Sequence, residues 1–227
     1  MRQVPFKLEM ISLRRSLCTP VPAILQAAEA LIEALELHSR GNTSGAEACL
    51  IRANDKAVWS YTDHAWGRGS ASRYGFISLA DAPPYLALSE RPKPRMPGTE
   101  TRKAMIARDG YHCRFCGIPV IDPDIRRLLV RAYPAAVSWG STNAAQHAAF
   151  QCMWLQFDHI LPNSRGGDSS LENMVVTCAP CNFGRMEATL EEARLINPLS
   201  SPVPVIWGHH AEWDGLERFR KVLRAES

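Results

Sequence analysis

Four of the seven cysteines stand in two C-x-x-C pairs that are far apart in the chain, Cys113 with Cys116 and Cys178 with Cys181. Cysteines two residues apart rarely bridge each other, whereas two such pairs together supply the four thiolates of a tetrahedral zinc site. We therefore expect one structural zinc ion on these residues. Two separate redox pairs are the alternative, but neither pair lies in a thioredoxin-like context.

A second group of polar residues lies near the later cysteine pair. Asp158 and His159 are adjacent at the end of an apolar stretch, and Asn182 directly follows Cys181. Carboxylate and amide oxygens suit a hard cation such as Mg²⁺, and His159 can accept a proton from water near neutral pH. Together these residue types suit metal-assisted hydrolysis of a phosphodiester bond.

The order of these residues makes geometric demands. Successive side chains of a strand point to opposite faces, so Asp158 and His159 share one task only if the strand twists locally. Asn182 is expected at a helix start, where it is a metal ligand, the helix N-cap or both. Arg165 and Arg185 are candidate phosphate contacts, although arginine is abundant here. Taken alone, His159 would more often be a core or surface histidine.

The combined pattern resembles the HNH endonuclease family in its zinc-bearing form. The motifs that carry the resemblance are C-x-x-C-G at 113–117, D-H-I-x-P-x-S-x-G-G at 158–167, Asn173, and C-x-x-C-N at 178–182. They fall within residues 100–196, which are under half of the 227-residue chain. The resemblance implies a ββα-metal nuclease fold and metal-dependent endonuclease activity, the hydrolysis of DNA phosphodiester bonds.

The resemblance also implies a role for each matching residue. Asp158 resembles the first ligand of a catalytic divalent cation, Mg²⁺ or Mn²⁺, and Asn182 resembles its final ligand. His159 resembles the general base that activates the attacking water. Asn173 resembles the middle asparagine, which braces the loop and orients the base. The four paired cysteines resemble the structural zinc ligands.

Three departures from the family pattern matter. Asn182 in place of a histidine removes a nitrogen ligand, which should weaken Zn²⁺ or Ni²⁺ binding at the catalytic site. Arg185 stands where relatives often carry lysine, which keeps the charge. A long gap of 41 residues separates Cys116 from Asp158, and this chain fills it with helical-looking material of its own.

The basic residues are unevenly distributed. The net charge is +3, but residues 91–131 alone carry +6, residues 1–90 are balanced, and residues 132–227 carry −3. A local basic block favours a polyanion partner, although a solvated linker is the alternative. With the resemblance, we expect double-stranded DNA, bound with weak sequence preference because backbone contacts carry no sequence information.

Composition and cysteine usage narrow the class of protein. A hydrophobic fraction of 46% and a charged fraction of 22% are typical of a globular protein. No run approaches 18 apolar residues, which argues against a membrane-spanning helix. Cys18, Cys49 and Cys152 are unpaired by spacing and are interpreted as buried small hydrophobes. This usage favours a reducing, cytoplasmic location.

The elements that must position these residues indicate an α+β chain. The expected organisation is a mainly helical N-terminal domain at 1–90, a Pro-rich basic linker at 91–98, the nuclease domain at 99–196 with a helical insertion at about 120–151, and a C-terminal linker and helix at 197–227. The first domain could bind a protein or DNA partner. Apolar periodicity and capping patterns predict helices at 22–38, 44–66, 99–109, 189–196 and 211–224, and strands at 73–80, 153–161 and 172–177.

Two functions remain open at this point. The first is an active, metal-dependent HNH endonuclease, a phosphodiester hydrolase. The alternative is a zinc-stabilised DNA-binding or protein-interaction module that has lost catalysis. A degenerate module would be expected to lack at least one of Asp158, His159, Asn173 and Asn182, and the complete set therefore favours the enzyme.

Overall fold

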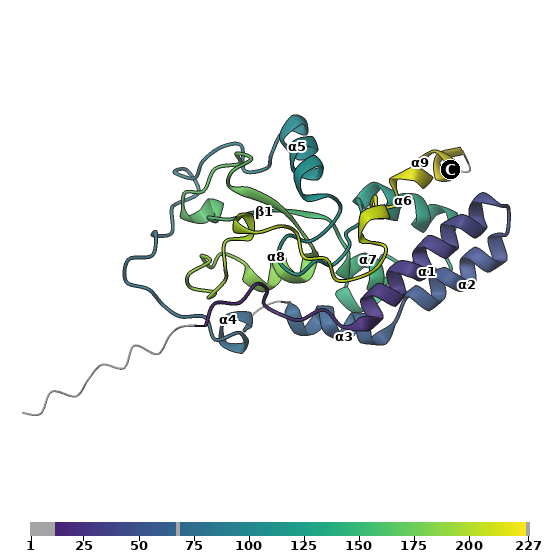
Figure 1. The fold of residues 1–227 in the computed structure, drawn as a ribbon, viewed down its shortest axis with the longest axis horizontal. Helices are drawn as coiled ribbons and strands as arrows, with labels where there is room; N and C mark the ends of the chain where they lie inside the picture. Colours follow the sequence, from purple (N-terminus) through teal and green to yellow (C-terminus); the bar gives the residue numbers. More distant parts are fainter. Residues whose placement is uncertain (1–11, 67–68, 226–227) are drawn as a thin grey trace, which may run out of the picture.

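The computed structural model describes residues 12–66 and 69–225, and shows helices packed around a small two-stranded sheet (Figure 1). The expected α+β fold with a mainly helical N-terminal region is confirmed. The N-terminal helices are α1 (Pro22–Ser39), α2 (Thr43–Ala53), α3 (Lys56–Ala65) and the short α4 (Ser70–Arg73). Helices α1 and α2 lie side by side as a hairpin that projects from the sheet-containing part.

The single helix expected over 44–66 is wrong, because the chain breaks between α2 and α3. The Asp55 carboxylate accepts a hydrogen bond from the backbone N–H of Ala57 and starts α3 as its N-cap. The Asn42 side chain caps α2 by accepting from the N–H of Gly45, so this helix begins at Thr43 and not at residue 44 as expected.

Residues 74–98 contain neither helix nor strand within the described chain, so the strand expected at 73–80 is wrong. Arg73 ends α4, Gly75 turns with φ at +62°, and the N–H of Ile77 donates to Glu192 rather than to a neighbouring strand. Residues 83–97, which we call the proline-rich strap, run along the loop that follows the first strand. The N–H of Leu86 donates to the carbonyl of Ser164 over 2.8 Å.

The central part of the fold is a ββα unit preceded by three helices. The helices are α5 (Thr99–Asp109), α6 (Pro123–Ala132) and α7 (Ala148–Cys152), and the unit itself comprises β1 (Gln156–His159), β2 (Met174–Thr177) and α8 (Ala179–Arg185). Strand β1 pairs with β2 in antiparallel register, with Gln156 opposite Thr177 and His159 opposite Met174. His159 and the start of α8 therefore lie at opposite ends of the hairpin.

Of two C-terminal helices expected from the sequence, the one at 189–196 does not form and the one at 211–224 forms only in its last part. Thr189 and Glu192 exchange the hydrogen bonds of a capping box, but the chain turns at Arg194 (φ +54°) instead of continuing as a helix. The helix expected at 211–224 is interrupted at Gly215 and Leu216, both with φ of +68°, and only α9 (Arg220–Ala225) is α-helical. The tryptophan of this stretch, Trp213, is nevertheless buried and donates its indole N–H to Val120.

One hydrophobic cluster extends from the N-terminal helices into the ββα unit. Helix α3 packs against α7 and α8, so the N-terminal helices cover one side of the unit that contains the sequence motifs. The division into domains at 91–98 stays a prediction. Among the described residues, no helix combines the length and apolar character needed to span a bilayer.

Candidate metal centre and active site

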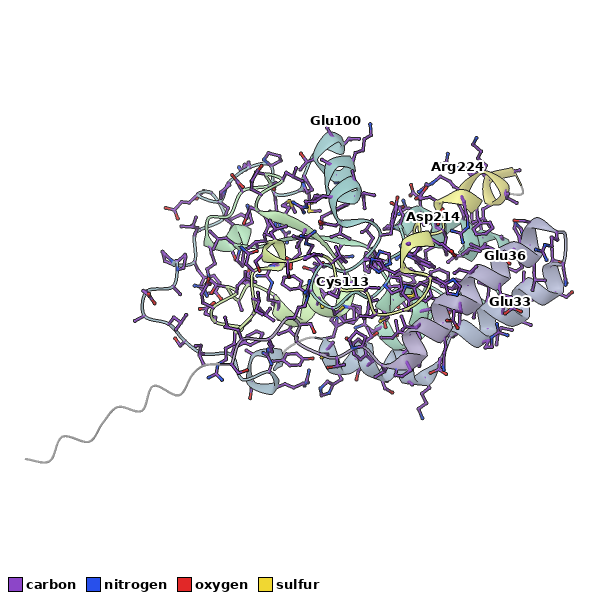
Figure 2. All side chains as sticks on the ribbon, in the orientation of Figure 1. Glu33, Glu36, Glu100, Cys113, Asp214 and Arg224 are labelled. Carbon is purple, nitrogen blue, oxygen red and sulfur yellow. The ribbon has the colours of Figure 1, made fainter. Side chains whose placement is uncertain are left out.

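The two C-x-x-C pairs come together in the interior. One sulfur from each of the four cysteines lies within 4.8 Å of all the others, and all four residues are buried. In Figure 2, Cys113 lies in the middle of the molecule, whereas Glu33 and Glu36 lie at its edge on α1. Four thiolates at about 2.3 Å from a tetrahedral zinc ion would lie about 3.8 Å apart. The Sγ atoms of Cys116 and Cys178 are 3.6 Å apart, so the donor set fits one metal ion.

Local backbone geometry places the four sulfurs. The N–H of Cys113 donates to Ile118 and the N–H of Gly117 donates to Cys113, which closes the first knuckle. Gly117 has φ at +80°, and a Cβ there would lie 2.6 Å from the carbonyl of Pro204, so this turn needs glycine. Cys178 is the N-cap residue of α8 and Cys181 stands in its first turn, so β2 delivers the second pair directly into the helix.

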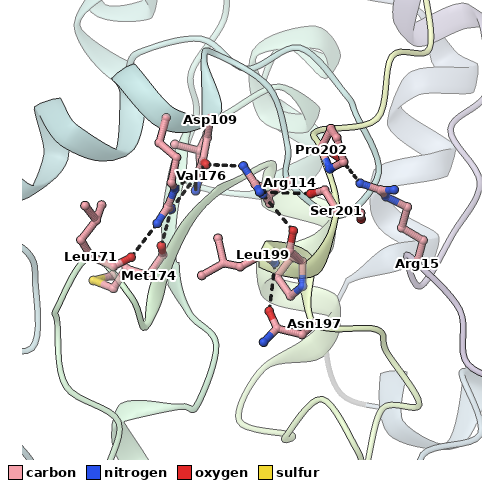
Figure 3. Close-up of polar contacts among 12 residues, drawn as sticks. Arg15, Asp109, Arg114, Leu171, Met174, Val176, Asn197, Leu199, Ser201 and Pro202 are labelled. Atoms are coloured by element: carbon pink, nitrogen blue, oxygen red, sulfur yellow. Dashed lines mark hydrogen bonds and ion pairs between the residues drawn. The ribbon is translucent and has the colours of Figure 1, made fainter.

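A buried ion-pair network joins the first knuckle to β2 (Figure 3). Asp109 accepts from Arg108 and Arg114, and also from the backbone N–H of Val176 over 3.0 Å. The Arg114 guanidinium also donates hydrogen bonds to the carbonyls of Pro198 and Ser201. Sequence reasoning missed this network, because a single aspartate between arginines is common on protein surfaces and no local pattern marks it as buried.

Strand β1 divides its side chains between two surroundings. Asp158 and Gln156 face α8, where Asp158 Oδ2 lies 2.8 Å from an Arg185 nitrogen and Gln156 Oε1 accepts from the Asn182 amide over 3.2 Å. His159 instead reaches Ser169, with 3.1 Å between Nε2 and the hydroxyl oxygen. Asp158, His159 and Asn182 still line one pocket of about 200 Å³, which runs along β1.

Asn173 lies at the base of the loop between the strands. Its Oδ1 accepts from the N–H of Leu161 over 2.8 Å, and its Nδ2 donates to the carbonyls of Leu161 and Asp168. Gly167 passes so close beneath this amide that a Cβ would lie 1.8 Å from the Leu161 carbonyl oxygen. The asparagine thus ties the two ends of the loop that carries Ser169.

The strap closes over this pocket from the side of His159. The Ser169 hydroxyl lies 2.8 Å from the carbonyl of Pro94 and 2.9 Å from that of Arg95, and the Asn163 amide donates to Pro92. Arg91 and Arg95 of the strap line the same pocket as His159. From the sequence, these two arginines were recognised only as members of the basic block at 91–131. Nothing local in the sequence shows where the strap docks, so their place in the pocket was not predicted.

Burial shifts the pKa values of His159 and Asp158 in opposite directions. Burial, together with the nearby charges of Arg185 and Arg95, lowers the pKa of His159 to about 4. The imidazole is therefore neutral at neutral pH and can accept a proton. Burial raises the pKa of the Asp158 carboxyl, and the adjacent guanidinium of Arg185 opposes that rise.

Arg185 and Arg165, the two candidate phosphate contacts, are both buried. Arg185 is only 1% exposed, and its guanidinium contacts Asp158 and the carbonyls of His159, Ile160 and Ala188. Arg165 pairs with both carboxylate oxygens of Glu192, and its guanidinium stacks 3.7 Å from the ring centre of Tyr85. The Arg185 guanidinium and the two terminal nitrogens of Arg165 donate to groups of the protein, which favours positioning roles for both residues.

Asn182 is not at a helix start, because α8 begins at Ala179 and Cys178 is its N-cap. The N-cap interpretation of Asn182 is therefore wrong. Its amide nitrogen donates to Gln156, and the residue lines the pocket. The group of Asn182 that can act as an acceptor is its amide oxygen. Two hard oxygen donors, one from Asp158 and one from Asn182, thus fit the chemistry of a cation such as Mg²⁺.

A buried four-sulfur centre lies beside a ββα unit, and β1 and α8 of that unit bring Asp158, His159 and Asn182 to one pocket. The family model described as HNH endonuclease matches residues 149–195, which contain β1, β2 and α8. The resemblance seen in the motifs is thereby confirmed, and this chain carries an HNH endonuclease domain. The match includes Cys178 and Cys181, and the fold brings Cys113 and Cys116 to it from outside the matched stretch. No curated protein and no solved structure matches the chain.

Proposed function

We propose that this protein is a metal-dependent endonuclease that hydrolyses phosphodiester bonds of DNA. The observation that carries the proposal is the single pocket lined by Asp158, His159 and Asn182 within the stretch that matches the HNH endonuclease family. Arg91 and Arg95 line the same pocket and supply positive charge for a phosphate.

In this proposal His159 is the general base. Its imidazole takes a proton from a water molecule that attacks phosphorus in line with the leaving 3′ oxygen. Asp158 and Asn182 would hold the divalent cation, Mg²⁺ or Mn²⁺, which when bound stabilises charge on the scissile phosphate and the leaving group. The products are expected to carry 5′-phosphate and 3′-hydroxyl ends.

Other residues hold these groups in place. Arg185 balances the buried carboxylate of Asp158, and Ser169 together with the loop tied by Asn173 holds the imidazole of His159. The four-cysteine centre binds zinc in this proposal and holds the segment that carries α8 against the segment that carries the first knuckle. Because these four ligands fill a tetrahedral shell, that ion is structural.

Purified protein incubated with supercoiled plasmid, with and without Mg²⁺, tests the proposal. We expect nicked or linear DNA in the presence of Mg²⁺ or Mn²⁺ and intact plasmid without them. DNA that is bound but left intact at every divalent cation tried would instead support the alternative, a zinc-stabilised binding module. Salt titration of the binding gives a second readout, since phosphate contacts make affinity fall with salt.

A further inference from the structure

Beyond the catalytic pocket, a groove continues across β1 toward α5 and α6. It consists of three adjoining hollows of about 200, 330 and 400 Å³. Phe157 lines all three, Met96 and Gln156 are shared by the first two, and Arg102 and Leu155 by the last two. We call this continuous surface the Phe157 groove. No role in the proposed chemistry accounts for an aromatic side chain at its centre.

Phe157 has a fixed relation to the proposed base. Residues two apart in a strand point to the same face, and two strand steps span about 6.6 Å. Phe157 and His159 therefore project side by side from β1, and both line the catalytic pocket. The Phe157 ring is half-buried, and the Arg102 guanidinium lies 5.7 Å from its centre.

The charges around the groove favour a polyanion. Arg102, Lys103 and Arg127 line its outer hollows. The carboxylates that also line it are Asp122, Asp124, Asp158 and Glu187. Asp122 and Asp124 lie 3.6 and 3.1 Å from nitrogens of Arg220, and Asp158 pairs with Arg185, so these three carboxylates have cationic partners. An aromatic side chain interleaved with cations is typical of surfaces on which the bases of a single strand stack.

We infer that the Phe157 groove binds an unpaired nucleotide of the DNA substrate, whose base stacks on Phe157 next to the scissile phosphate held at His159. This inference rests on the proposed function and narrows its substrate class. Both faces of a base inside a continuous duplex are covered by its neighbours, so only an unstacked base can lie on the ring. The favoured substrates are single strands, and duplexes interrupted beside the cleaved bond.

The test compares three labelled DNAs of equal length: a single strand, a duplex with a splayed single-stranded arm, and a continuous duplex. Kd and cleavage rate are measured with the full chain, using Ca²⁺ in place of Mg²⁺ for the binding experiments. We expect the wild-type protein to prefer the first two. Phe157→Ala should weaken binding of those two by about 5- to 100-fold, the size of one lost base stack, with less than twofold change on the continuous duplex. Phe157→Trp should retain the preference.

Phe76→Ala is the matched control, since Phe76 is also half-buried but lines a different hollow on the other side of Arg185. It should leave the preference unchanged. Equal losses on all three DNAs in Phe157→Ala would mean that Phe157 only supports the fold and would overturn the inference. A wild-type protein that cuts continuous duplex best would overturn it while leaving the proposed function intact. A protein that neither binds nor cuts any DNA would overturn the proposed function itself.

Discussion

The four-cysteine centre and the pocket at His159 both draw residues from the ββα unit, and their donor groups differ in kind and in exposure. The centre has four buried sulfurs within 4.8 Å of one another. The pocket has two oxygen donors, one of them on a carboxylate already paired with Arg185, around a space of about 200 Å³. Cys181 and Asn182 are neighbours in α8, so a single helix contributes to both.

In the proposed function, the four-cysteine centre stabilises the fold and the pocket at His159 carries out the chemistry. A metal site whose ligands all come from the protein is closed and stabilises the fold, whereas a catalytic site keeps positions for substrate and water. Changes at the cysteines should therefore act on folding, and changes at the pocket should act on cleavage or on the local support of Asp158.

The largest effect is expected for Cys178→Ser. The metal would lose one of its four protein ligands. At structural zinc sites, binding of the metal ion supplies much of the folding free energy of small domains. We expect loss of the bound zinc, from one ion per chain toward none, and loss of a cooperative thermal unfolding transition. Elemental analysis and calorimetry measure both.

Cys49→Ala is the matched control, since Cys49 is buried in the helical region and is not one of the residues of the four-cysteine centre. It should keep one zinc ion per chain. A Cys178→Ser protein with full metal content and an unchanged melting temperature would contradict the structural role of the centre.

A smaller effect is expected for Arg185→Met. The substitution leaves the Asp158 carboxylate buried without its cation, which costs about 3–5 kcal/mol and should lower Tm by roughly 6–20 °C. The double variant Arg185→Met with Asp158→Asn should recover part of that loss, because no buried charge is left unpaired. If Arg185→Met melted like the wild type and only bound DNA more weakly, Arg185 would be a phosphate contact after all.

The smallest effects are expected for substitutions of Arg95 and Arg165, and they should differ in kind: one on DNA binding and the other on stability. Arg95 is exposed on the strap and lines the pocket, so Arg95→Gln should weaken DNA binding a few-fold and reduce the salt slope by about one, with unchanged Tm. Arg165 is buried against Glu192, so Arg165→Gln should lower stability by about 1–3 kcal/mol and leave DNA affinity unchanged. Anisotropy titrations and thermal melts would reveal the reverse pattern if these assignments were exchanged.

Local patterns in the sequence were sufficient for much of the site. The cysteine spacing predicted a four-thiolate group, and the structure brings those residues together. Apolar runs located β1 and β2, and the helix predicted at 99–109 coincides with α5. Strand alternation and helix termination are encoded within a few residues. The breaks at Asp55 and Gly215 were missed, since continuous apolar periodicity concealed a capping aspartate and a turn.

Long-range pairing is the part that the sequence does not display. Arg185 meets Asp158 across 27 residues, and Asp109 meets Val176 across 67. Arginine, aspartate and proline are common on surfaces, so their types alone predicted phosphate contacts and a linker. The docking of the strap over His159 depends on hydrogen bonds from Asn163 and Ser169 that only the folded loop creates.

The central claim is that His159 acts as the general base, whereas the four-cysteine centre stabilises the fold that carries it. Its most direct test is the cleavage rate of plasmid by wild-type protein and by His159→Ala, in preparations matched for zinc content and Tm. We predict a rate lowered by about 10²–10⁴-fold, the usual cost of removing a general base, with one zinc ion per chain and the same Tm. Equal cleavage rates in the two proteins would contradict the claim.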